Sequence, residues 1–453
     1  MRQRKDGKKE QLSPRVGILS LGCAKNLVDS EHIGSLLEEA GVQVTTDIAS
    51  APVVIVNSCG FIDIAKEESI DAVLEVADLK ETGQLRHLIV TGCLTERYGD
   101  ELRELLPEAD VMTGIDPHAA AREALWELGI KDPLPSQCNL RAHRFTPRSW
   151  SYLRISEGCD NCCAYCAIPS IRGPLVSRPM DEIVAEAEDL VDQGARELNI
   201  IAQDTTAYGR EHGKARLHQL LRRLCETEHD GWIRLLYTHP AGYYPELIDV
   251  LAEQEAICPY LDIPLQHVAD PILERMGRGV QRSEIEELIG TLRDRIPNLT
   301  LRTTFLVGFP GETDEDFQEL MDFARRVRFE RLGAFRYSKE EDTRASEFED
   351  QVREDIREER YHELMQLQRE IAFETAAERI GQHTTVLVEE DQVEGAEDQA
   401  IARSPAEAPD VDPIVFIEDA EDLRRGQMVE VEIIDSFEYD CIARPIRRNQ
   451  NEE

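Results

Sequence analysis

The residues of this chain with the clearest capacity for chemistry are cysteines, of which 11 occur among 453 residues. Four of them stand in the stretch "CDNCCAYC", in which Cys159, Cys163 and Cys166 have CxxxCxxC spacing and Cys162 is an additional thiol. Thiolates this close together bind zinc or iron–sulfur clusters. Three thiolates leave one iron of a 4Fe-4S cluster open to a substrate or cofactor.

The additional thiol, Cys162, keeps a zinc site among the alternatives. A structural zinc ion needs four protein ligands, and this loop contains four cysteines. Cys162 and Cys163 are adjacent, however, and adjacent ligands are cramped around a single ion. An iron–sulfur cluster held by the other three thiolates is therefore the favoured interpretation, and zinc is the alternative.

A second set of cysteines follows three short apolar runs near the start of the chain. Cys23 ends "VGILSLGC", Cys59 lies in "VVIVNSCG" and Cys93 lies in "LIVTGCL". Each run has the length and composition of a buried strand. Because ligands of parallel α/β sheets collect at the carboxyl ends of the strands, we expect these cysteines to converge on one site. The alternative is that all three are buried structural residues.

The remaining cysteines stand singly, at Cys138, Cys225, Cys258 and Cys441. An isolated cysteine usually behaves as a small buried hydrophobic residue. We therefore expect no metal or redox role for these four.

The elements that must position the cysteines fall into three segments. Residues 14–134 alternate short apolar runs with amphipathic stretches such as "DSEHIGSLLEEAG", which predicts an N-terminal parallel α/β domain. Residues 144–374 repeat a strand and a helix about six times, which predicts a partial (β/α)6 barrel. Residues 377–447 contain short strands separated by turns, which predicts a small antiparallel β-barrel.

Polar residues follow several strands of the predicted (β/α)6 barrel. They are Gln203, Asp204, His239, Gln266 and His267. Active sites of such barrels lie at the carboxyl ends of the strands, so we expect these residues to line the top face. Each of them could instead cap a helix or satisfy a backbone group.

The composition of the chain limits its location and its partners. No apolar run is long enough to span a membrane, and the stretch "MRQRKDGKKEQLSPR" lacks the apolar block of a secretory signal. We therefore expect a cytoplasmic protein without membrane contact. The formal net charge of −39 disfavours broad attraction to nucleic acid and suits a basic partner. Adaptation to a salty cytoplasm would give the same composition.

The loop "CDNCCAYC" resembles the CxxxCxΦC loop of radical S-adenosylmethionine (SAM) enzymes. The resemblance implies that Cys159, Cys163 and Cys166 hold a catalytic 4Fe-4S cluster whose open iron binds SAM. It also implies that Tyr165 lies against the adenine. Gln203, which follows a strand of the predicted barrel, is expected to bind the cofactor. Reduction of such a cluster cleaves SAM to a 5′-deoxyadenosyl radical, which abstracts hydrogen from an unactivated carbon.

Further motifs resemble the methylthiotransferases within that superfamily. "LGCAKNLVDSE", "NSCGFI" and "TGCL" are similar to their N-terminal domain, which implies that Cys23, Cys59 and Cys93 hold a second, auxiliary 4Fe-4S cluster. "AIPSIRGPLVSRP", "LERMGRG" and "VGFPGETDEDF" are similar to their radical domain, and the end of the chain is similar to their TRAM barrel. Ala24 stands where proline is common, which removes no ligand.

The substrate of such an enzyme is either an adenosine of transfer RNA or an aspartate of small-subunit ribosomal protein S-twelve. From Gly381 onward the chain has 20 acidic and six basic residues, a net charge of −14, which disfavours contact with RNA phosphates. "RSPAEAPDVD" is similar to the branch that modifies the ribosomal protein and suits a basic loop. The resemblance implies β-methylthiolation of the aspartate, with transfer RNA as the alternative.

The resemblance also implies partners for the reaction. They are ribosomal protein S-twelve or the small ribosomal subunit, and an electron donor such as flavodoxin or ferredoxin. A non-catalytic iron–sulfur or RNA-binding adaptor with the same fold is a hypothesis of another class. The presence of all six expected cluster ligands argues against it.

Overall fold

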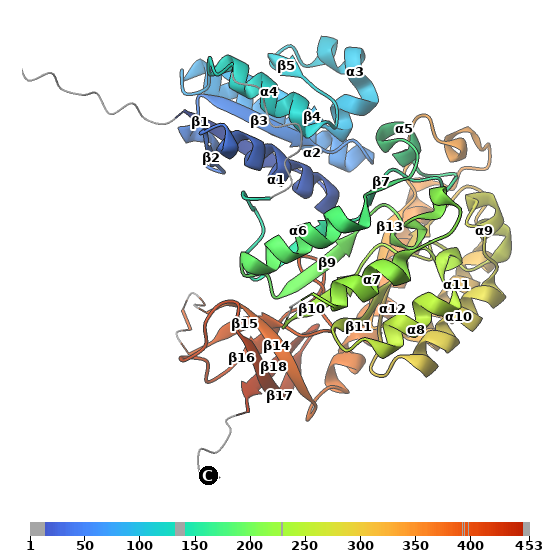
Figure 1. Cartoon of the computed structure of the whole chain (residues 1–453). Helices are drawn as coiled ribbons and strands as arrows, with labels where there is room; N and C mark the ends of the chain where they lie inside the picture. The colour runs from blue at the N-terminus through green and yellow to red at the C-terminus, as the bar shows by residue number, and fades with distance from the viewer. Residues whose placement is uncertain are drawn as a thin grey trace, which may run out of the picture. The chain divides into compact units, whose positions relative to one another are not determined.

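The computed structural model describes residues 14–446 apart from 132–140, 228–229, 392, 394 and 397. The chain divides into two compact units, one up to Phe145 and one from Thr146 onward (Figure 1). None of the described helices is both long enough and apolar enough to cross a membrane.

The first unit is built on a five-stranded parallel sheet with the strand order β2-β1-β3-β4-β5. Its strands are β1 Arg15–Ser20, β2 Gln43–Thr45, β3 Val53–Ser58, β4 His87–Gly92 and β5 Val111–Met112. Its helices are α1 Ala24–Glu39, α2 Asp63–Glu81, α3 Cys93–Leu105 and α4 Pro117–Glu127, with a 3-10 turn η1 at Ile48–Ser50. The predicted parallel α/β fold is confirmed.

The two faces of this sheet carry separate apolar cores. Val53 and Ile55 of β3 pack with residues of α1 and α4, whereas Val54 and Val56 pack with residues of α2 and α3. All four side chains are buried because a parallel strand has helices on both of its faces. This double burial leaves the carboxyl edge of the sheet as the place for polar chemistry.

The second unit contains a six-stranded parallel sheet with the order β13-β12-β11-β10-β9-β6. Its strands are β6 Trp150–Arg154, β9 Glu197–Ile201, β10 Trp232–Leu235, β11 Ile257–Asp262, β12 Thr300–Val307 and β13 Arg331–Arg336. Its helices include α6 Met180–Asp192, α7 Leu217–Cys225, α8 Pro245–Glu253, α9 Asp270–Met276, α10 Arg282–Arg295 and α11 Asp314–Val327. The predicted partial (β/α)6 barrel is confirmed.

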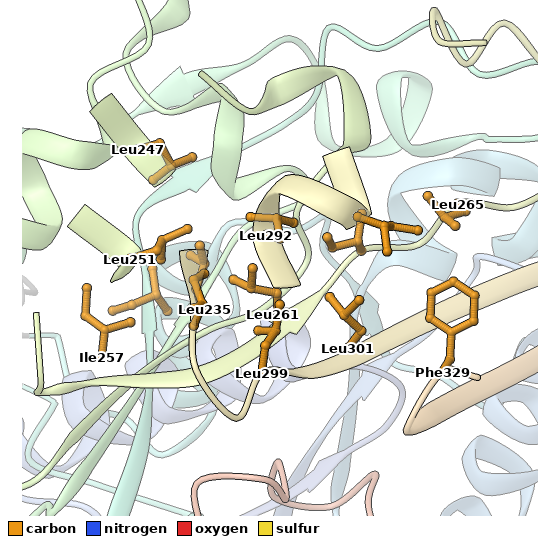
Figure 2. Packing of buried hydrophobic residues seen from close by; sticks show 14 of the residues in the cluster. Leu235, Leu247, Leu251, Ile257, Leu261, Leu265, Leu292, Leu299, Leu301 and Phe329 are labelled. Atoms are coloured by element: carbon orange, nitrogen blue, oxygen red, sulfur yellow. The ribbon is translucent and has the colours of Figure 1, made fainter. Parts of the chain in front are cut away.

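Leucines fill the space between this sheet and its outer helices (Figure 2). Leu235, Leu261 and Leu301 come from the strands, and Leu251 and Leu292 come from α8 and α10. Burial of a side chain of this size contributes about 1.5–3 kcal/mol each, so the outer layer fixes the positions of the strand ends.

Short elements surround the cysteine loop of the second unit. Two-residue strands β7 Ser156–Glu157 and β8 Val176–Ser177 pair in antiparallel fashion on either side of it. The helix α5 Ile168–Arg172 follows the last cysteine of the loop. Further 3-10 turns are η2 Thr205–Ala207, η3 Arg210–His212, η4 Pro240–Gly242 and η5 Arg344–Glu347.

A small closed barrel ends the second unit, with the strand order β14-β15-β16-β18-β17. Its strands are β14 His383–Glu390, β15 Ala400–Arg403, β16 Val415–Ile417, β17 Met428–Phe437 and β18 Asp440–Pro445. The pairs are antiparallel as predicted, except that β16 pairs with β18 in parallel. The helix α12 Glu354–Ala377 connects the six-stranded sheet to the small barrel. Its Leu364 packs in the apolar core of the six-stranded sheet, and its Ala376 packs in the apolar core of the small barrel.

Buried ion pairs join the small barrel to the amino ends of the parallel strands. Arg403 of β15 donates to Glu197, the first residue of β9, at 2.6 Å, and contacts Glu389 of β14 at 2.7 Å. Arg234 of β10 donates to the same Glu197 at 2.7 Å and to the Pro405 carbonyl at 2.6 Å. Burial opposes ionisation of Glu197, but Arg403 and Arg234 lower its pKa. The small barrel therefore lies at the amino ends of the parallel strands. The top face lies at their carboxyl ends, at the opposite end of the sheet.

Two candidate cysteine sites

The cysteine loop of the second unit is held by backbone hydrogen bonds to distant segments. The Cys159 amide donates to the Gly173 carbonyl at 3.1 Å, and the Ala164 amide donates to the Met276 carbonyl at 2.8 Å. Gly158 enters the loop with φ of +71°, and a Cβ there would lie 2.0 Å from the Pro174 carbonyl oxygen. Only glycine fits at position 158. The chain can therefore turn from β7 into the cysteine loop only with glycine at this position.

Each of the three spaced sulfurs accepts a hydrogen bond. The amide of Asn161 donates to Cys159 Sγ at 3.4 Å, and the amide of Ile168 donates to Cys166 Sγ at 3.5 Å. The third sulfur, of Cys163, accepts from a guanidinium at 3.4 Å. Donors aimed at sulfur are a typical environment of iron–sulfur cluster ligands.

Burial makes two of these thiols, those of Cys159 and Cys166, poor acids in the absence of a bound cation. It raises the pKa of Cys159 to about 11 and that of Cys166 to about 12, and the negative charge of neighbouring Cys163 adds to both shifts. Because Cys163 affects both of the other thiols, the three sulfur atoms lie close to one another. A metal cluster would supply the positive charge that keeps all three ionised, so the donor set fits a three-thiolate cluster.

The additional cysteine, Cys162, has a different environment. Its side chain is exposed, and its Sγ lies 3.7 Å from the carbonyl oxygen of Asp160. Its own carbonyl accepts a hydrogen bond from Arg344. Among the described residues, no three His, Cys, Asp or Glu side chains are arranged to hold a bare metal ion.

An arginine that the sequence analysis did not single out completes this site. Arg278 is only 5% exposed and follows α9 within the motif "LERMGRG". Its Nη1 lies 3.4 Å from Cys163 Sγ and 3.3 Å from Tyr165 Oη, and its Nη2 donates to the Pro264 carbonyl at 2.6 Å. The motif was a signal for the family, but nothing in it identified a contact with a cysteine.

The structure places Tyr165 beside the cysteines and against an apolar cluster. Its ring meets the ring of Phe309 edge-on, with the centroids 6.5 Å apart. Burial raises the pKa of the phenol well above its usual value, so the hydroxyl stays protonated and accepts from Arg278. The predicted contact with an adenine remains a prediction.

Gln203 lies next to Glu157 at the start of the loop. Its Nε2 donates to Glu157 Oε1 at 2.6 Å, whereas its buried Oε1 has no hydrogen-bond partner among the described residues. Burial opposes ionisation of Glu157, but Arg154 and Arg172 beside it lower its pKa. Glu157 therefore fixes the amide of Gln203 and leaves a carbonyl oxygen available to a donor on a bound molecule.

The other four residues expected at the top face differ in what they contact. Asp204 accepts from Asn161 at 2.8 Å, so it supports the cysteine loop. His239 and His267 each accept a backbone amide through Nδ1, and burial lowers their pKa values to about 2 and about 3. Gln266 has φ of +73° and joins its backbone to that of β12. The two neutral histidines and Gln266 satisfy local backbone groups, as the alternative reading of these positions anticipated.

The first unit assembles its cysteines from three strand ends. Cys23 precedes α1, Cys59 directly follows β3, and Cys93 directly follows β4. The parallel register pairs Ser20 with Asn57 and Ser58 with Gly92, so the three strands end at the same edge of the sheet.

Close contacts link the three cysteine segments of this unit. A Cβ at Gly22 would lie 3.0 Å from Cys59 Sγ, and Cys93 Sγ lies 3.4 Å from Asn26 Oδ1. Asn26 in turn donates to the Ser58 carbonyl at 2.9 Å. Cys59 and Cys93 are buried and Cys23 is exposed, so the group has one open side. Three thiols with an open side fit a cluster that must reach a substrate.

The isolated cysteines show no comparable grouping where they are described. Cys258 and Cys441 are buried, as expected for isolated cysteines, and Cys225 is partly buried. Cys138 lies outside the described residues.

Comparison with family models identifies three regions of the chain. Residues 153–324 match the radical SAM superfamily, residues 15–114 match uncharacterized protein family UPF0004, and residues 380–446 match the TRAM domain. The last two regions coincide with the five-stranded sheet and the closed barrel.

Curated relatives match over nearly the whole chain. The ribosomal protein uS12 methylthiotransferase RimO of Natranaerobius thermophilus is 45% identical over 438 residues, covering 94% of this chain and 98% of the relative. RimO of Desulforamulus reducens is 45% identical, with 95% and 99% covered, and RimO of Geobacter sulfurreducens is 43% identical, with 94% and 98% covered.

Solved structures resemble the chain in fold. The radical SAM methyltransferase TsrM from Kitasatospora setae has a TM-score of 0.54 at 18% identity, covering 71% of this chain and 73% of that one. The cobalamin-dependent radical SAM enzyme OxsB has a TM-score of 0.51 at 12% identity, covering 77% and 56%. At these identities the likeness concerns the fold alone.

Proposed function

This chain belongs to the RimO family of ribosomal protein uS12 methylthiotransferases, and we propose that it catalyses methylthiolation of the β-carbon of an aspartate of that protein. The observation that carries the proposal is the pair of three-cysteine groups, one in each compact unit. The cofactors implied are two 4Fe-4S clusters and SAM. When bound, they supply one-electron cleavage of SAM and transfer of a sulfur-containing group.

The residues of the second unit would bind and orient the radical cluster and SAM. Cys159, Cys163 and Cys166 would hold the radical cluster through thiolates that accept hydrogen bonds. Gln203 would present its Oε1 to a donor group of SAM, because Glu157 already occupies its amide nitrogen. Tyr165, which is partly buried against the apolar cluster, stays neutral and offers an aromatic surface. Together these groups bind the cofactor away from bulk water.

The residues of the first unit hold the second cluster. Cys23, Cys59 and Cys93 would be its ligands, and the exposed position of Cys23 leaves that cluster accessible to the sulfur species. Asn26 positions the site by bridging β3 and the Cys93 side chain.

The test of the function uses the full chain reconstituted with iron and sulfide without oxygen. SAM, a reductant and either purified uS12 or unmodified transfer RNA are added, and each product is analysed by mass spectrometry. We expect a methylthio group on one aspartate of uS12 and none on the RNA. A methylthio group on the RNA alone would replace this proposal by the transfer RNA alternative.

The small barrel is the proposed contact for the basic ribosomal protein, but two of the three carboxylates in "RSPAEAPDVD" are buried and do not form part of it. Within residues 403–412, the side chain of Glu407 is 2% exposed and contacts Arg331 at 3.0 Å, and Asp412 is 3% exposed. The Tyr260 hydroxyl donates to Asp412 at 2.6 Å. The expectation that this segment presents its carboxylates to a partner is wrong for these residues, because arginines and tyrosines of the neighbouring sheet contact them.

Exposed carboxylates of β17 and its turn carry the proposed contact instead. They are Glu432, Asp435 and Glu438, all of which are exposed. Positive charge on a ribosomal protein would be steered to this face, and the effect would weaken with salt because the screening length is about 10 Å at 0.1 M. The barrel lies at the amino ends of the parallel strands, so its charge acts on association and not on SAM cleavage.

Charge reversal tests this contact. The triple variant Glu432→Lys, Asp435→Lys and Glu438→Lys should slow association with uS12, most strongly at low salt. The matched control reverses three exposed carboxylates of α2, Glu68, Asp71 and Glu75, which changes the net charge by the same amount. Equal effects of the two triple variants would favour the salt-adaptation explanation over docking.

We also propose that a flavodoxin or ferredoxin of the cytoplasm reduces the radical cluster. Plant-type ferredoxins reach about −400 mV, within the range needed to reduce a 4Fe-4S cluster. Each donor would be supplied with its reductase in place of a chemical reductant, and 5′-deoxyadenosine would be measured. Failure of both donors to support cleavage in an active preparation would exclude this class.

A further inference from the structure

Arg278 differs from the other buried arginines of the second unit in having no carboxylate partner. Arg234 and Arg403 share the buried Glu197, and Arg360 contacts the buried Glu312 at 2.9 Å. Arg278 is equally buried, yet no ion pair joins it to any described carboxylate within 4.0 Å. Its Nε is also buried without a hydrogen-bond partner among the described residues.

A buried cation without a counter-charge is strongly unfavourable. The groups that face the Arg278 guanidinium are the Cys163 sulfur, the Tyr165 hydroxyl and the Pro264 carbonyl. Asp204 attracts the Arg278 guanidinium more weakly, and its carboxylate oxygens accept hydrogen bonds from Asn161 and Thr206. Of these groups, the sulfur is the one that becomes negative when it binds a metal cluster.

We propose that Arg278 is a positioning residue that supplies positive charge to the Cys163 thiolate and thereby raises the reduction potential of the radical cluster. The inference rests on the proposed function only in assuming a 4Fe-4S cluster at Cys159, Cys163 and Cys166. Reduction adds one electron to a group that is already negative. A fixed buried cation at 3.4 Å from one ligand favours the more negative, reduced state.

The same guanidinium also fixes the geometry of the site. It joins Cys163, Tyr165 and the Pro264 carbonyl, which come from the cysteine loop and from the segment after β11. A merely structural role would require these hydrogen bonds but would not change the potential. The potential therefore separates the two roles.

The test measures the midpoint potential of the radical cluster by a redox titration followed by electron paramagnetic resonance. Every variant carries Cys23→Ala, Cys59→Ala and Cys93→Ala, so that one cluster remains. We expect Arg278→Gln to shift the potential to more negative values with the iron content retained. Arg278→Lys, which keeps the charge, should stay closer to the parent.

Arg344→Gln is the matched control, because Arg344 contacts the same loop through the Cys162 carbonyl but is exposed. It should leave the potential unchanged. If Arg278→Gln loses the cluster and Arg278→Lys keeps it with its potential, the requirement for charge is supported.

An unchanged potential in Arg278→Gln would overturn the proposal, as would loss of the cluster in both Arg278 variants. Neither result concerns uS12. A parent enzyme that cleaves SAM but does not modify uS12 would instead contradict the proposed function and leave this inference standing.

Discussion

The two cysteine sites are built in opposite ways. In the second unit Cys159, Cys163 and Cys166 lie in a single loop, so their spacing along the chain sets their spacing in space. In the first unit Cys23 and Cys93 are separated by three strands and two helices, and the register of a parallel sheet brings them together.

The electrostatic settings of the two sites also differ. The loop sulfurs accept hydrogen bonds from two backbone amides and one guanidinium. In the first unit the Cys93 sulfur faces the side-chain oxygen of Asn26. Donors to sulfur stabilise added negative charge, so the loop site suits a cluster that must be reduced.

The largest effect is expected from loss of a loop ligand. Cys163→Ala removes a thiolate from the radical cluster and should reduce SAM cleavage to background while the first unit keeps its iron. The measurements are 5′-deoxyadenosine formation and iron content per chain. Normal cleavage by this variant would show that Cys163 is not a ligand.

Loss of a cysteine of the first unit is expected to abolish only the methylthio transfer. Cys59→Ala should retain part of the SAM cleavage but give no methylthio product, because the two sites lie in different units. Cleavage and product are measured on the same preparation, with Cys258→Ala as a control at another buried cysteine. Product formation at the normal rate would remove Cys59 from the auxiliary site.

A smaller effect is expected from backbone crowding at the convergent site. Gly22 has φ of +86°, and a Cβ there would lie 2.7 Å from the Cβ of Cys59. Gly22→Ala should therefore displace Cys59 and lower the iron content of the first unit.

Gly41→Ala is the control for this change, because Gly41 has φ of +79° but nothing within 4 Å of the added Cβ. It should lose about 1–2 kcal/mol of unfolding free energy from backbone strain without loss of iron. Unfolding is followed with denaturant, and iron is assayed separately. Equal iron contents in the two variants would argue against a tight packing of Gly22 on the site.

The smallest effect is expected at the exposed thiol of the loop. Cys162→Ser should leave the iron content and the turnover close to those of the parent, because the Cys162 side chain is exposed and its Sγ lies 3.7 Å from the Asp160 carbonyl oxygen. Loss of a cluster's iron in this variant would revive the four-cysteine metal site.

Strong periodic patterns predicted most of the fold. The sequence "DEDFQELMDFARRV" predicts a helix, and α11 spans the same residues, Asp314–Val327. Within the two parallel sheets and the closed barrel, the strands β2, β5, β15 and β18 have no counterpart in the sequence analysis. Three of them have four residues or fewer, which is too short for an alternating pattern to be recognised.

The cluster ligands could be predicted where they lie close together in the sequence or where the same position after a strand holds a cysteine several times. The CxxxCxxC spacing identified the loop, and a cysteine after each of three strands suggested the second group. Arg278 was not predictable, because it meets Cys163 across 115 residues of sequence. No spacing rule connects two residues that far apart.

The sequence was sufficient to predict the ligand types, most of the strand and helix pattern of both units and the family. The tertiary structure was needed to show which charges are exposed and which are buried, as Glu407 and Asp412 illustrate. The physical reason is that the free energy of a charged side chain depends on its neighbours in space. The sequence alone does not distinguish an acidic residue that is surrounded by water from one that is paired with an arginine of a distant strand.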